Sequence, residues 1–86
     1  MAKVSVVILN WNGRNLLEKF LPSVVKYSPA SVELFVVDNA STDDSLTFLT
    51  VNYPNIKIIK NSQNGGFAKG YNDGLKQIKS AYYVLL

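Results

Sequence analysis

The sequence predicts an α/β fold, an open parallel sheet of about four strands with helices on both faces. Four apolar runs of strand length recur along the chain, and segments of helical length separate them. Three of these runs are almost continuously apolar, which is typical of strands covered on both faces of a parallel sheet. The runs are Val4–Leu9, Leu34–Val37, Ile56–Ile59 and Tyr82–Leu86.

The segment after the first strand is predicted to be an amphipathic helix over Asn15–Tyr27. Its charged residues lie opposite an apolar face, and Pro22 inside it predicts a kink or a break. The apolar face consists of Leu16, Leu17, Phe20, Leu21, Val24 and Val25.

The second helix is predicted to begin at Ser41, whose side chain would cap it, and to end near Tyr53. Asp43 and Asp44 would then lie in its first turn, where their charges offset the helix dipole rather than bind a metal. The third helix is predicted over Phe67–Lys79, because apolar residues recur there along one stripe.

Right-handed connections between neighbouring strands predict the spatial order 3-2-1-4, with the first strand inside the sheet. Ligands of such sheets bind beyond the carboxyl ends of the strands, near the point where the chain changes direction. The sequence stops inside its last strand-like run, so residues 1–86 are expected to form one truncated domain.

Composition excludes several classes of chemistry. The chain has 86 residues without cysteine or histidine, which excludes a thiol nucleophile, a cysteine-ligated metal and a histidine base. Its apolar runs are far below the roughly 20 residues of a membrane-spanning helix. The net charge of +3 is too mild for a dedicated nucleic-acid binder, so we expect no nucleic acid as a partner. A cytoplasmic location is the default expectation.

Polar loops follow the first three predicted strands, and parallel strands would bring them to one rim. They are Asn10–Gly13, Asp38–Ser41 and Asn61–Gly66. Asp38 is their only acidic residue, and a carboxylate opposite a base would select one with an imino N–H, such as uracil, thymine or guanine. Alternatively, Asp38 forms an Asx turn that ties its loop to the following helix. Trp11 either stacks on a base or sugar, or fills a gap beside the first helix.

Glycines mark the segment Asn64–Gly74. Gly65 and Gly66 would open a helix N-terminus, which suits an anion such as a diphosphate, and Lys69 lies one turn further on. Gly70 and Gly74 are unfavourable inside a helix and predict a close approach of its backbone to another element. The alternative is packing of the helix on the sheet without any ligand.

Three segments together resemble a known family. VSVVILNWNG over Val4–Gly13, VVDNASTDDS over Val36–Ser45 and NGGFAKGYNDG over Asn64–Gly74 resemble the N-terminal half of family 2 glycosyltransferases, most closely a rhamnosyltransferase-like bacterial branch. The resemblance implies the nucleotide-binding half of a Rossmann-like GT-A fold. Enzymes of this kind move a sugar from a nucleotide diphosphate donor to an acceptor hydroxyl, usually with a divalent metal, Mg²⁺ or Mn²⁺.

The resemblance also implies site residues and partners. Asn10, Trp11 and Asn12 would line the nucleoside pocket, and Asp38 with Asn39 would read the base. The residues that would border the nucleotide and its diphosphate are Asn64, Gly66, Phe67, Lys69 and Asn72. The expected donor is a nucleotide diphosphate sugar of the uridine or thymidine type, and the expected acceptor of a longer parent enzyme is a saccharide or a lipid-linked acceptor.

The family's acidic D-x-D-like metal motif and its catalytic carboxylate follow a run like Tyr82–Leu86, at which this sequence stops. We therefore expect these 86 residues to hold no metal and to be catalytically inactive, and the parent to be a glycosyltransferase, in the cytoplasm or at the inner face of the membrane. One alternative is a non-enzymatic α/β module that binds a nucleotide or a partner. Another is self-association through the uncovered edge at Tyr82–Leu86.

Overall fold

The computed structural model describes residues 4–29, 31–63, 65–78 and 82–85. Strands and helices alternate along the chain, as the apolar runs predict. The elements are β1 (Val4–Asn10), α1 (Arg14–Tyr27), β2 (Val32–Asp38), α2 (Ser45–Asn52), β3 (Lys57–Lys60), α3 (Phe67–Leu75) and β4 (Tyr82–Leu85). No helix in these described ranges is long and apolar enough to cross a membrane.

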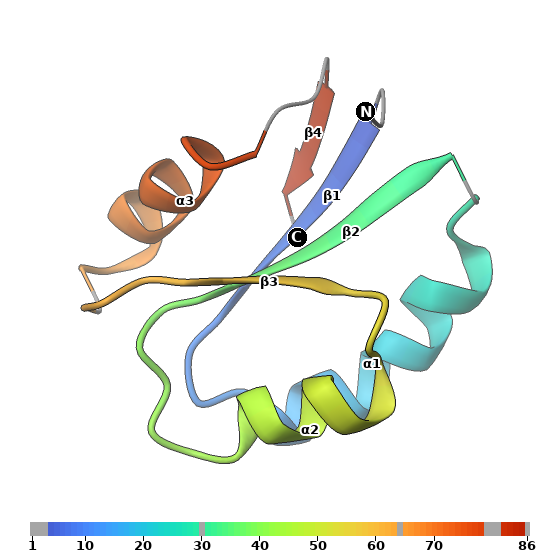
Figure 1. Ribbon diagram of the computed structural model, residues 1–86, viewed down its shortest axis with the longest axis horizontal. Coiled ribbons are helices and arrows are strands. Elements are labelled where there is room, and N and C mark those ends of the chain that lie inside the picture. The colour runs from blue at the N-terminus through green and yellow to red at the C-terminus, as the bar shows by residue number, and fades with distance from the viewer. Residues whose placement is uncertain (1–3, 30, 64, 79–81, 86) are drawn as a thin grey trace.

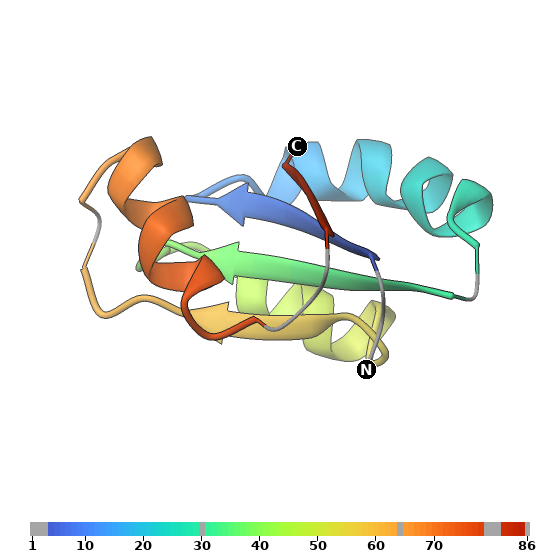
Figure 2. The same ribbon diagram turned by 90° about the horizontal axis from the view of Figure 1, so that it is seen from above.

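The four strands form one parallel sheet in the order β3-β2-β1-β4, which is the predicted order (Figure 1). β1 and β2 pair along their whole length, so that Asn10 lies beside Asp38 at the end of the register. β4 pairs with β1 over Val4–Val7. In Figure 2, β1, β2 and β3 point the same way, so the loops that follow them leave the sheet at one edge.

Helices cover both faces of the sheet, as predicted, with α1 and α2 on one side and α3 on the other (Figure 1). Alternate residues of a strand point to opposite faces, so neighbouring residues of β2 enter different cores. The core under α1 and α2 contains Ile8, Leu17, Leu21, Val36, Phe48, Leu49 and Ile56. The core under α3 contains Val7, Phe35, Val37 and Ile78.

Of the kink or break predicted at Pro22, the break is wrong, because α1 continues through that residue as one helix. Proline cannot bond the carbonyl of Glu18, but both residues are exposed, so water can satisfy that carbonyl. Leu17 and Leu21 are the buried residues of this helix. Leu16 and Val25 are 64% and 41% exposed, so the buried stripe is narrower than predicted.

The predicted start of α2 at Ser41 is also wrong, because the helix begins at Ser45. The hydroxyl of Ser41 is bonded to Asp38 in its own loop, and Asp43 instead accepts the backbone N–H of Ser45 at 3.0 Å. The N-cap position is Asp44, whose side chain makes no capping hydrogen bond, and the predicted place of Asp43 and Asp44 in the first turn of α2 is therefore wrong. α3 ends at Leu75, earlier than predicted.

The glycines of α3 bring its backbone close to the sheet, as predicted. A β-carbon on Gly74 would lie 2.5 Å from Val37 Cγ2, and one on Gly70 would lie 3.0 Å from Leu9 Cδ1 and 3.1 Å from Asn39 Nδ2. These distances are shorter than ordinary van der Waals contacts. The missing side chains thus let α3 lie against the carboxyl-terminal halves of β1 and β2.

Candidate functional site

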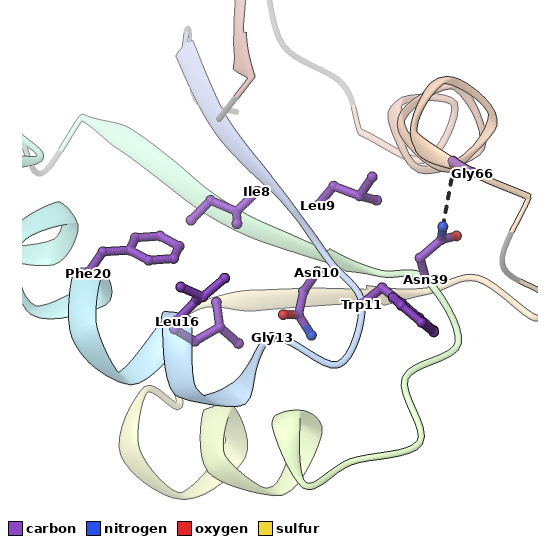
Figure 3. A pocket seen from close by; sticks show the side chains of 10 residues that line it. Ile8, Leu9, Asn10, Trp11, Gly13, Leu16, Phe20, Asn39 and Gly66 are labelled. Atoms are coloured by element: carbon purple, nitrogen blue, oxygen red, sulfur yellow. Dashed lines mark hydrogen bonds between the residues drawn. The ribbon is translucent and has the colours of Figure 1, made fainter.

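A cavity of about 310 Å³ lies between the end of β1 and the start of α1 (Figure 3). Residues of all three polar loops line it together with apolar residues of β1 and α1. The lining residues are Ile8, Leu9, Asn10, Trp11, Gly13, Leu16, Leu17, Phe20, Asn39 and Gly66. The predicted meeting of the three loops at one rim is therefore confirmed.

The cavity has an apolar wall and a rim of neutral polar groups. Leu16, Leu17 and Phe20 of α1 supply part of that wall, and Asn10 and Asn39 supply amides. None of the described residues that line it carries a charged side chain. Trp11 is 57% exposed at the mouth, so much of its indole is open to solvent rather than packed in the core. Such a cavity suits a planar, neutral group with hydrogen-bonding edges.

The carboxylate of Asp38 is turned into the protein, where the residue is 1% exposed. Its Oδ1 accepts hydrogen bonds from Asn10 Nδ2 at 3.0 Å and from the Ser41 hydroxyl at 2.7 Å. Its Oδ2 accepts the backbone N–H of Ser41 at 3.0 Å. Asp38 thus ties its own loop, as in the alternative to base reading, but through the backbone N–H of the third residue on rather than the second of an Asx turn. Direct reading of a base by Asp38 stays a prediction.

Asn39 is the polar side chain of this loop that borders the cavity. Its Nδ2 donates to the carbonyl of Gly66 at 3.4 Å (Figure 3). Its Oδ1 accepts a hydrogen bond from Asn61 Nδ2 at 3.1 Å. Asn61 Nδ2 also donates to the carbonyl of Gly70 at 3.2 Å. The two amides thus fasten the beginning of α3 to the ends of β2 and β3, and they hold Gly66 at the cavity.

The family model described as glycosyl transferase family 2 matches residues 5–86. The chain belongs to glycosyl transferase family 2. Two similar relatives of this family 2 chain are uncharacterized glycosyltransferases. The one from Rickettsia prowazekii is 28% identical over 83 residues, with 96% of this chain and 26% of the relative covered. The one from Haemophilus influenzae is 29% identical over 84 residues, with 94% of this chain and 26% of the relative covered.

Solved structures of similar proteins share the fold of this family 2 chain. The S. aureus protein TarS superimposes with a TM-score of 0.82 at 29% identity, covering 98% of this chain and 26% of TarS. A mannosyltransferase from Pyrobaculum calidifontis, solved with GDP-Man and Mn²⁺, superimposes with a TM-score of 0.75 at 24% identity. The match covers 90% of this chain and 24% of the mannosyltransferase. The chain thus spans about a quarter of the length of these relatives.

Other residues predicted to bind the nucleotide lie away from the cavity or outside the described residues. Lys69 Nζ contacts Asp73 Oδ2 at 2.8 Å and borders a separate polar cavity of about 420 Å³ beside the end of β3. This hydrogen bond, together with the charges of Lys69 and Lys76, lowers the pKa of Asp73. Asn72 is exposed on α3. Asn64 and the side chains of Phe67 and of Tyr82–Leu86 lie outside the described part of the chain.

Three residues of the site were not among the predicted site residues. Ser41 bonds both Asn10 and Asp38, Asn61 holds Asn39, and Gly13 lies so close to Asn10 that a β-carbon would be 2.6 Å from Asn10 Oδ1. The sequence signal for Ser41 was its place in the polar loop Asp38–Ser41, whose aspartate can bond the backbone of its own loop. No comparable signal pointed to Gly13.

The described residues do not fit a divalent metal. Within 4–29, 31–63, 65–78 and 82–85, no three Asp, Glu, His or Cys side chains lie where they could hold an ion together. Asp43 instead accepts hydrogen bonds from the backbone N–H groups of Arg14 and Ser45. Partial desolvation raises its pKa, but hydrogen bonds from Ser45 and from the backbone of Arg14 outweigh this, so the pKa is lowered.

Proposed function

We propose that residues 1–86 form the part of a glycosyltransferase that binds the nucleotide of a nucleotide diphosphate sugar. The cavity bounded by Trp11, Asn39 and Gly66 carries the proposal, because it joins an aromatic face, an amide and a helix N-terminus. Membership of family 2 and the glycosyltransferase relatives support it. Transfer of the sugar to an acceptor hydroxyl, of a saccharide or a lipid-linked acceptor, is then the proposed reaction of the whole protein.

In this proposal the base stacks on Trp11 and the diphosphate lies toward Gly66. The indole offers an exposed face, and the backbone at the beginning of α3 carries the positive end of a helix dipole. Gly66 has a φ of 90°, which glycine adopts without strain and which a larger residue would disfavour. The backbone can therefore take a turn that residues with a β-carbon avoid, directly at the cavity.

We further propose that bases with an imino N–H, as in uridine, thymidine and guanosine, are preferred to adenine. Asn39 lines the cavity and Asp38 does not, so we assign the acceptor for the imino N–H to the side-chain carbonyl of Asn39. Two proteins of the same fold were solved with nucleotides of this kind, one with GDP-Man and the mycobacterial glucosyl-3-phosphoglycerate synthase with UDP.

Nucleotide titration followed by tryptophan fluorescence tests this directly, because Trp11 is the only tryptophan of the chain. UDP, dTDP and GDP are expected to change its emission saturably, and ADP to require about tenfold higher concentration, which corresponds to the loss of one hydrogen bond. Pyrophosphate alone is the control for binding without a base. A change that rises linearly with nucleotide, as for free tryptophan in solution, would contradict the proposal.

We propose that the isolated 86 residues bind this nucleotide without transferring the sugar. About three quarters of the length of each of these two relatives lies outside the matched region, and both oxygens of Asp38 accept hydrogen bonds from the protein. Incubation with UDP-sugars and a range of acceptors should release UDP no faster than buffer does, in a sample that shows saturable binding. Acceptor-dependent release above that rate would overturn the expected inactivity.

A further inference from the structure

The loop between β1 and α1 and the loop between β2 and α2 meet at one hydroxyl. Ser41 Oγ accepts the backbone N–H of Asn12 at 2.9 Å and Asn10 Nδ2 at 3.2 Å. The same hydroxyl donates to Asp38 Oδ1 at 2.7 Å. A hydroxyl has one donor and two acceptor lone pairs. Ser41 therefore uses its full hydrogen-bonding capacity between the two loops.

A second set of bonds joins the same loops nearer to the surface. Asn12 Oδ1 accepts the backbone N–H groups of Thr42 at 2.7 Å and Asp43 at 3.1 Å. In the opposite direction, the backbone N–H of Arg14 donates to Asp43 Oδ2 at 3.2 Å. Each loop thus supplies both donors and acceptors to the other, and neither can move without breaking several bonds.

Trp11 and Asn39 each lie directly beside residues of these hydrogen-bonded loops. Trp11 lies between Asn10 and Asn12, and Asn39 lies between Asp38 and Ala40. Asn12 and Ala40 have φ angles of 50° and 63°, a left-handed conformation that residues other than glycine adopt only when their surroundings hold them there. The bonds around Ser41 supply that constraint on both sides of the rim.

We propose that Asn10, Asn12, Asp38 and Ser41 form a clasp that positions Trp11 and Asn39, and that Asp38 acts through this clasp rather than by contact with the base. The inference rests on the proposed nucleotide site and assigns a different role to three residues expected to touch the nucleotide. The contacts of Asp38 support it, because both of its oxygens accept hydrogen bonds from Asn10 or Ser41 and, unlike Asn39, it does not line the cavity. A base could bond Asp38 only after displacing Asn10 or Ser41 from it.

Exchanging the side chains of Asn10 and Asp38 distinguishes a positioning role of Asp38 from direct contact between Asp38 and the base. Asp38→Asn leaves amide hydrogens opposed to the donors of Asn10 and Ser41, and Asn10→Asp places two carboxylates side by side. The double variant Asn10→Asp, Asp38→Asn restores the complementarity in reverse, because the amide at 38 can donate to the carboxylate at 10 and its oxygen can accept Ser41 N–H. The exchange keeps the net charge, since one carboxylate remains in the pair.

Three quantities are measured for each variant: the fluorescence emission of Trp11 without ligand, the accessibility of Trp11 to a neutral quencher, and the affinity for UDP. Circular dichroism verifies that each variant is folded. Each single variant is expected to alter the Trp11 emission and to weaken UDP binding by about tenfold or more, the loss expected from one or two hydrogen bonds. The double variant is expected to recover both properties. Unchanged Trp11 emission in Asp38→Asn, combined with an altered base preference that the double variant retains, would overturn the clasp and favour direct contact.

Two milder substitutions at Ser41 keep the test decisive if a variant at Asn10 or Asp38 does not fold. Ser41→Ala removes the shared hydroxyl, whereas Ser41→Thr retains it, so only the first should alter Trp11 emission. Ser23→Ala, an exposed serine in α1, is the matched control. Equal emission in Ser41→Ala and wild type would overturn the clasp. Absence of saturable nucleotide binding by wild type, with the emission pattern as expected, would overturn the proposed function alone.

Discussion

Trp11→Ala is expected to weaken nucleotide binding by about tenfold or more, because the base would lose the aromatic ring on which it stacks. Stacking of a base on an aromatic ring contributes about 1–3 kcal/mol by alanine substitution. Trp11 is 57% exposed and outside both buried clusters, so its loss should leave the melting temperature almost unchanged. Isothermal calorimetry with UDP is the suitable measurement, because the variant has no tryptophan to report binding.

Two further variants give this experiment its controls. Trp11→Phe keeps an aromatic face and should retain most of the affinity. Tyr27→Ala removes another exposed aromatic residue, 76% exposed at the far end of α1, and should bind UDP like wild type. Equal affinity of Trp11→Ala and wild type would show that the base does not stack on this residue, and would place the nucleotide elsewhere.

Gly74→Ala is expected to destabilise the fold by about 1–2 kcal/mol. The added β-carbon would lie 2.5 Å from Val37 Cγ2 and 2.8 Å from Val37 Cγ1, and Val37 is fully buried, so it cannot turn away. Overpacking of a core costs about 1–3 kcal/mol, and the better helix propensity of alanine offsets up to about 1 kcal/mol of this. Thermal unfolding should show a melting temperature lower by roughly 4–16 °C.

A compensating variant tests the stated cause. In a Val37→Ala background the two methyl groups that meet the new β-carbon are absent, so Gly74→Ala should then be neutral or stabilising. A double-mutant cycle measures this coupling. If Gly74→Ala costs the same in both backgrounds, the close approach of α3 to β2 is not the reason for a glycine at this position.

Strand order and layer arrangement could be predicted because each depends on signals that lie close together in the sequence. The apolar runs mark the strands, and the rule for right-handed connections then leaves one simple order. The meeting of the three loops follows from that order, since parallel strands end at one edge. None of these steps requires the orientation of a single side chain.

The start of α2 and the hydrogen bond between Asn10 and Asp38 could not be predicted, because they depend on partners far along the chain. Ser41 has the residue type of a helix cap, but its hydroxyl is bonded to Asn10, 31 residues earlier. Asp38 has the residue type of a base-reading group, but the register of β1 and β2 places the amide of Asn10 beside it. Lys69 similarly pairs with Asp73 on its own helix rather than facing the cavity.

The neighbouring positions of Asn10 and Asp38 also disfavour a misfolded sheet in which β2 is shifted along β1. Slippage of β2 by one residue along β1 would reverse which face each of its side chains occupies, and would leave a carboxylate and an amide buried without each other. Apolar residues such as Val36 and Val37 tolerate such an error far better, because each is acceptable in either core. The polar pair therefore discriminates against the shifted sheet, and the same two residues that shape the rim also select the correct strand alignment.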